Sequence, residues 1–109
     1  MQYIVSKLKG LGLTVKSGVA KTGVVAILKG NKPGPVIALR ADIDALPVIE
    51  RSSLTYASKE IGEYNGQKVP VMHACGHDAH IAILLGTATV LSKMKNDIAG
   101  SIVFIFQPA

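Results

Sequence analysis

The sequence has only one cysteine, Cys75, and no apolar run near the roughly 18 residues that a membrane span needs. A single cysteine excludes an intrachain disulfide and a disulfide-stapled secreted domain, so a reducing, cytoplasmic setting is expected. The first residues lack the long apolar stretch of a signal peptide, and no membrane partner is expected. The net charge of +5 comes from scattered residues rather than a dense basic stripe. No nucleic-acid partner is therefore expected.

The chain has enough apolar residues to bury a core. It is 109 residues long, 49% apolar and 17% charged, which fits one small folded domain and excludes a disordered chain. An amphipathic helix is expected at the start, because apolar residues recur there at helical spacing. They are Met1, Ile4, Val5 and Leu8. Residues 13–15 then indicate a short strand.

Three apolar runs rich in β-branched residues predict strands over residues 24–28, 36–40 and 101–106. The Gly-Asn-Lys-Pro-Gly turn signal at 30–34 separates the first two runs, so a β-hairpin is expected there. Because the runs are apolar at every position, we expect strands covered on both faces, with helices on both sides of the sheet. The predicted fold class is α/β, with a partial mixed sheet flanked by helices.

The stretch over residues 41–70 is polar and broken by glycine and proline, which indicates a long loop. Long ordered loops in compact domains are usually functional. Beyond it, apolar side chains at helical spacing predict a helix over about 79–95, with Asp78 placed to cap its start. Lys93 in the last turn suits the negative end of the helix dipole.

All three histidines and the cysteine fall together just before this helix. They are His73, Cys75, His77 and His80. Thiolate and imidazole are metal ligands, and a bend at Gly76 allows Cys75 and His77 to reach one cation. The alternative is a lone buried cysteine beside surface histidines, because Cys-x-His alone is not the spacing of a structural zinc site.

Two carboxylates, Asp42 and Asp44, follow directly after the strand predicted over 36–40. In open α/β sheets, sites gather beyond the carboxyl ends of the strands, so this position favours a functional role. The alternative is a turn in which Asp42 bonds its own backbone. The carboxylates and the Cys/His cluster are expected to share one mouth, because one group follows a strand and the other starts a helix that leads to the next strand.

Three stretches of the sequence carry a family resemblance. They are Leu-Arg-Ala-Asp-Ile-Asp-Ala-Leu-Pro at 39–47, Met-His-Ala-Cys-Gly-His-Asp-Ala-His at 72–80 and Phe-Ile-Phe-Gln-Pro-Ala at 104–109. In this order they resemble motifs of the hippurate hydrolase and N-acyl-amino-acid amidohydrolase family, which belongs with two-metal zinc carboxypeptidases and aminoacylases. The resemblance implies that residues 1–109 are the N-terminal part of a zinc-exopeptidase-like catalytic domain, incomplete and without its lid or dimerisation domain.

The resemblance also implies a chemistry, the hydrolysis of the amide bond of a small N-acyl amino acid such as hippurate or an N-acetyl amino acid. By match to the motifs, Cys75 and His77 would be metal ligands, and Asp42 and Asp44 the catalytic carboxylates, with Asp42 supporting the metal site. The implied cofactors are divalent metal ions, two in the complete enzyme, chosen from zinc, manganese, cobalt or nickel. Such ions lower the pKa of a bridging water and polarise the scissile carbonyl.

In the family, the general base comes from a Glu-Glu pair directly after the Gln-Pro-Ala stretch, and this sequence ends at Ala109. The 109 residues alone are therefore expected to be inactive. The rival hypothesis is a non-catalytic α/β module that binds a metal or pairs with a partner, a second copy included, through its incomplete sheet. A Cys-His nucleophilic hydrolase is a third hypothesis, and the spacing indicates neither the orienting group nor the oxyanion donor that it needs.

Overall fold

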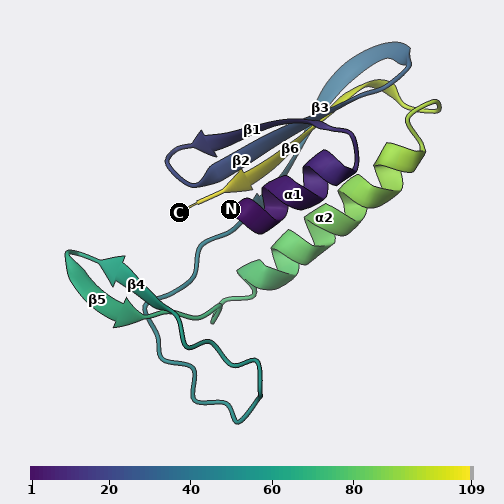
Figure 1. Cartoon of the computed structure of the whole chain (residues 1–109). Coiled ribbons are helices and arrows are strands. Elements are labelled where there is room, and N and C mark those ends of the chain that lie inside the picture. The colour runs from purple at the N-terminus through teal and green to yellow at the C-terminus, as the bar shows by residue number, and fades with distance from the viewer. Residues whose placement is uncertain (109) are drawn as a thin grey trace.

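The computed structural model describes residues 1–108, which form two helices and six strands. In chain order the elements are α1 (Gln2–Gly10), β1 (Thr14–Val19), β2 (Gly23–Lys29), β3 (Lys32–Asp42), β4 (Ile61–Tyr64), β5 (Gln67–Pro70), α2 (His77–Lys93) and β6 (Ala99–Gln107). Four strands form one sheet in the order β1-β2-β6-β3, and β4 pairs with β5 in a separate hairpin (Figure 1). The α/β class, the mixed sheet and the three predicted strands are confirmed.

The last strand, β6, lies between β2 and β3. It runs antiparallel to β2 and parallel to β3, with Phe104 opposite both Ala26 and Leu39. The hairpin predicted between residues 24–28 and 36–40 is therefore wrong, and the hairpin in this sheet joins β1 to β2. The turn signal marks only a change of direction: the Gly30 amide donates to the carbonyl oxygen of Gly100, so the chain after β2 turns beside β6.

Both helices pack on the same face of the sheet (Figure 1). The core between the layers consists mainly of Val24, Ala26, Leu28, Ile102, Phe104 and Phe106 from the sheet and Ile4, Leu8, Leu84 and Ala88 from the helices. Helices on both sides were expected, and that prediction is wrong for residues 1–108. The apolar runs do place apolar residues on both faces, but on the bare face Ile27 and Val36 are 42% and 69% exposed.

The helix predicted over about 79–95 is α2, which begins and ends two residues earlier. The predicted capping by Asp78 is wrong: the N-cap is Gly76, in the left-handed conformation, and no side chain caps the helix. Asp78 lies in the first turn, where its charge still suits the helix dipole. Neither helix in the described part of the chain is long and apolar enough to cross a membrane.

Residues 43–76, which we call the excursion, leave the sheet after β3 and return at α2 (Figure 1). The sequence analysis treated most of this stretch as loop and missed the β4–β5 hairpin. Asn65 and Gly66 form its turn, both with positive φ, as a two-residue hairpin turn requires. The excursion is also joined to itself by a β-bridge between Leu46 and Met72.

Candidate metal site

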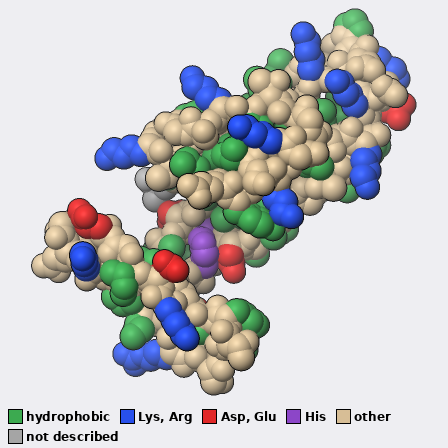
Figure 2. All heavy atoms as spheres, in the orientation of Figure 1, with side chains coloured by type: hydrophobic (Ala, Val, Ile, Leu, Met, Phe, Trp, Pro, Cys, Tyr) green, Lys and Arg blue, Asp and Glu red, His purple; other side chains and the backbone are tan. Residues whose placement is uncertain are grey.

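The candidate site lies where the two parallel strands end and α2 begins. Asp42 is the last residue of β3 and lies opposite Gln107, the last residue of β6. Asp44 follows two residues later, at the start of the excursion, and His77 is the first residue of α2. Figure 2 shows histidine side chains between the sheet-and-helix body and the excursion, with acidic side chains close by.

One imidazole lies between two carboxylates. His77 Nδ1 is 2.8 Å from Asp44 Oδ1, and His77 Nε2 is 3.9 Å from Asp42 Oδ2. Arg40 forms an ion pair with the other oxygen of Asp42. All three side chains of the cluster are largely buried, with 19% of His77, 29% of Asp42 and 20% of Asp44 exposed. The structure therefore brings Asp42 and Asp44, at and just beyond the end of β3, together with His77, at the start of α2, in one site.

The donor atoms fit a divalent metal ion. Asp42, His77 and His80 each offer one ligand atom, and these atoms lie within 4.8 Å of one another. Among residues 1–108, buried His77 Nδ1 has no hydrogen-bond partner, because its approach to Asp44 is close but outside hydrogen-bond geometry. With Nδ1 facing Asp44, His77 presents Nε2 toward Asp42, and imidazole with carboxylate is a donor set that suits transition metals.

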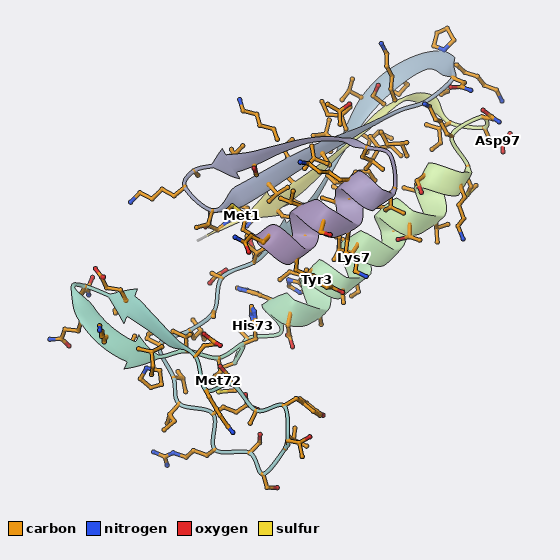
Figure 3. The ribbon with its side chains drawn as sticks, viewed as in Figure 1. Met1, Tyr3, Lys7, Met72, His73 and Asp97 are labelled. Atoms are coloured by element: carbon orange, nitrogen blue, oxygen red, sulfur yellow. The ribbon has the colours of Figure 1, made fainter. Side chains whose placement is uncertain are left out.

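The remaining members of the Cys/His cluster lie differently. Cys75 is exposed and free, and it is not among the three donors that gather. Its role as a ligand stays a prediction. His80, to which the sequence analysis gave no role, stacks near His77 with ring centroids 5.5 Å apart. The spacing of His77 and His80 could have predicted this, because side chains three residues apart on a helix share a face. Figure 3 shows His73 on the segment that leads into α2.

Two hollows flank the site. One, of about 360 Å³, is largely apolar and is lined by Leu39, Arg40, His80, Ile83, Leu84 and Thr87. The other, of about 370 Å³, lies against the excursion, and its lining combines apolar residues with the polar side chains of Glu50, Tyr56, Ser58, Glu60, His73 and Asp78. Both have the size of small-ligand pockets. Neither lining includes His77, Asp42 or Asp44, so the hollows adjoin the cluster through its sequence neighbours.

A carboxylate–histidine cluster beyond the ends of parallel strands is typical of metal-dependent hydrolases with an α/β catalytic domain. The chain belongs to peptidase family M20/M25/M40, whose sequence profile matches residues 38–109. It is 50% identical over 109 residues to thermostable carboxypeptidase 2 of Saccharolobus solfataricus. It is 46% identical over 108 residues to the N-acyl-L-amino acid amidohydrolase of Geobacillus stearothermophilus. The family resemblance is confirmed.

The fold agrees with this membership. A crystal structure of a dinuclear metal-binding peptidase of the M20 family from Bacillus subtilis matches with a TM-score of 0.85 and 43% identity. That match covers 99% of this chain and 28% of the Bacillus protein. This chain also covers 99% of its own length in both sequence matches, but only 26% and 27% of those relatives. It therefore spans about a quarter of the length of the proteins it resembles.

Proposed function

We propose that this chain supplies part of the metal site of an amidohydrolase that cleaves the amide bond of N-acyl amino acids, hippurate-like or N-acetylated. The observation that carries the proposal is the contact between His77 and Asp44, formed by two motifs far apart in the sequence. Family membership supports a metal-dependent hydrolase, and the Geobacillus relative is named for this substrate class. The free Cys75 suits a reducing, cytoplasmic setting.

Each residue of the site has a proposed task. Cys75 and His77 hold metal, and Asp42 supports it from the strand end. Asp44 orients the His77 ring, as carboxylates do for most metal-binding histidines. His77 Nε2 and Asp42 Oδ2 lie 3.9 Å apart, so both would face an ion held at this end of the sheet. When bound, the divalent metals supply a Lewis acid and activate a water molecule.

A second candidate function is a partner-binding module without catalysis. The bare face of the sheet favours it, because Ile27 and Val36 are exposed there in a contiguous apolar surface with Val25, Val103 and Ile105. The outer edge of β3 is also unpaired in the described sheet. Open strand edges and apolar patches promote association. This candidate predicts binding of a second copy, with or without metal.

A chimera tests the amidohydrolase proposal. This chain would replace the corresponding 108 residues of the Geobacillus amidohydrolase, to which it is 46% identical. We expect the chimera to release amino acid from N-acetyl and N-benzoyl substrates, and Asp44→Asn to lower that activity about 10- to 100-fold. Asp97→Asn, an exposed change outside the site, is the matched control. A folded, metal-loaded chimera without turnover would contradict the proposal.

The 109-residue chain alone is expected to show no turnover with any divalent metal. Both carboxylates of the described site are engaged, Asp42 with Arg40 and Asp44 beside His77. Neither is then free to take a proton from water and pass it to the leaving amine, and losing a general base costs roughly 10²–10⁴-fold. Activity that survives purification and disappears in His77→Ala would overturn this expectation.

A further inference from the structure

Within the excursion, two sets of hydrogen bonds hold Val71 and Met72, near its end, against its earlier residues. The first set is the bridge between Leu46 and Met72, whose amides donate to each other's carbonyl oxygens at 2.8 and 3.1 Å. The bridge joins the stretch that follows Asp44 to the stretch that precedes His77. It therefore links the two halves of the candidate site through the backbone.

The second set, which we call the Ser58 network, consists of Glu50, Ser52, Ser58 and Val71. The Ser58 amide donates to Glu50 Oε2 at 2.7 Å, and the Ser58 hydroxyl donates to the Val71 carbonyl oxygen at 2.6 Å. Ser52 Oγ donates to the other carboxylate oxygen of Glu50 at 2.7 Å. The hydrogen bonds from Ser58 and Ser52 lower the pKa of Glu50, so its carboxylate is ionised at neutral pH.

The position of His77 depends on the segment that this network holds. Val71 directly precedes Met72, and Figure 3 shows Met72 and His73 on the last part of the excursion, close to the start of α2. The helix start has no side-chain cap, and its N-cap Gly76 is in the left-handed conformation. The packing of α2 on the sheet fixes the helix itself, and the anchoring of residues 71–72 fixes the other end of the short segment that leads into His77.

We propose that Ser58 is a positioning residue of the metal site, which acts through Val71 and Met72 on the placement of His77. The inference rests on the proposed function in one respect, that the site binds metal. Ser58 suits the role because its amide and hydroxyl reach two different segments, the Glu50 loop and the strand-like stretch at Val71. Loss of the hydroxyl removes its bond to the Val71 carbonyl oxygen and the bond that it accepts from the Glu60 amide, and leaves the bond from the Ser58 amide to Glu50 in place. The Val71 amide keeps its bond to the Glu60 carbonyl oxygen.

The test uses cobalt binding to the 109-residue chain, measured by titration and by the ligand-field spectrum at saturation. Ser58→Ala removes the hydroxyl, and Ser58→Thr restores one. Ser53→Ala is the matched control, since Ser53 is exposed in the same loop and has no side-chain hydrogen bond within residues 1–108. Amide exchange at Val71 and Met72, followed by NMR, is the second measurement. Glu50→Gln is an independent variant should Ser58→Ala fold poorly.

We expect cobalt affinity to fall about tenfold in Ser58→Ala, the lower end of the effect of outer ligand supports, with a changed spectrum at saturation. If Ser58→Ala lowered only the overall stability of the fold, the ligand-field spectrum at cobalt saturation would stay the same as in wild type. Ser58→Thr and Ser53→Ala should bind within about twofold of wild type. Equal affinity and an equal spectrum in Ser58→Ala would overturn the proposal.

The two proposals fail in different ways. If the wild-type chain binds no cobalt, the metal site of the proposed function is contradicted. Amide exchange then tests separately whether the Ser58 hydroxyl holds residues 71–72 in place. At least tenfold faster exchange of the Met72 amide in Ser58→Ala, but not in Ser53→Ala, supports the Ser58 network. Exchange as slow as in wild type overturns it.

Discussion

The body of the molecule, residues 1–42 and 77–107, and the excursion, residues 43–76, are held together by different forces. Every fully buried apolar side chain of the described core comes from the body. The excursion contributes a hairpin, one β-bridge and the Ser58 network, and its Tyr56 and Ile61 are 80% and 61% exposed. Apolar burial therefore sets the stability of the fold, whereas a few hydrogen bonds set the geometry of a site that lies between the two regions.

The largest expected effect is on the stability of the body. Phe104 is fully buried between the helices and the sheet, so Phe104→Ala should lower the free energy of unfolding by about 3–5 kcal/mol. Tyr56→Ala, in the excursion, should change it by less than about 0.5 kcal/mol. Urea unfolding followed by circular dichroism measures both. Similar losses at the two positions would show that the excursion shares the core.

The next effect is on the site between the regions. Asp44→Asn keeps the shape of the side chain but removes the charge beside His77, and should weaken metal binding about 10- to 100-fold. Isothermal titration with zinc measures the change, with Asp97→Asn as the charge-matched control. Unchanged affinity in Asp44→Asn would mean that the close contact in the structure does not support a metal ligand.

A smaller effect is expected on self-association of the body. Ile27 lies in the middle of the bare sheet face, so Ile27→Lys should weaken dimerisation of the chain about tenfold, which corresponds to roughly 1.4 kcal/mol of lost apolar burial. Tyr64→Lys adds the same charge in the excursion and should have little effect. Sedimentation velocity over a range of concentrations measures this, and a wild-type chain that stays monomeric throughout would remove the association hypothesis.

The smallest effect concerns pH and the excursion. Because hydrogen bonds lower the pKa of Glu50 in the fold below its ordinary 4.5, the group stabilises the fold above that value. This contribution is lost as the pH falls through the lower folded pKa. Thermal unfolding of Glu50→Gln should therefore depend less steeply on pH below about 4.5, where Glu63→Gln, an exposed control, should follow wild type. Parallel profiles for all three proteins would contradict the Glu50 contacts.

The same two regions differ in what could be predicted from sequence. Strand and helix periodicity predicted the elements of the body closely, because amphipathic and apolar runs are local signals. The place of β6 between β2 and β3 depends on contacts across the whole chain and could not be predicted from a local turn signal. In the excursion, the Asn65-Gly66 hairpin was predictable from its turn residues, whereas the Ser58 network joins residues with no periodic relation.

For the site, residue chemistry and the motifs predicted Asp42, Asp44 and His77, and the structure brings these three together. His80 needed the helix register, which places it near His77. Cys75 belongs to the same motif but lies on an exposed bend next to Gly76, outside the gathered donors. Sequence could predict which residues carry chemistry, but their distances depend on how the excursion folds back.

The most direct test of the account is calorimetric titration of the 109-residue chain with cobalt and zinc, in wild type, Cys75→Ala, His77→Ala and His80→Ala. We predict saturable binding in wild type and its loss, by at least about a hundredfold, in His77→Ala and Cys75→Ala, since transition-metal affinity depends on the number and type of ligands. Binding lost in His80→Ala but retained in Cys75→Ala would replace Cys75 with His80 as the ligand. Absence of binding in wild type, or equal binding in wild type and His77→Ala, would contradict the claim that strand-end carboxylates and the start of α2 form one metal site.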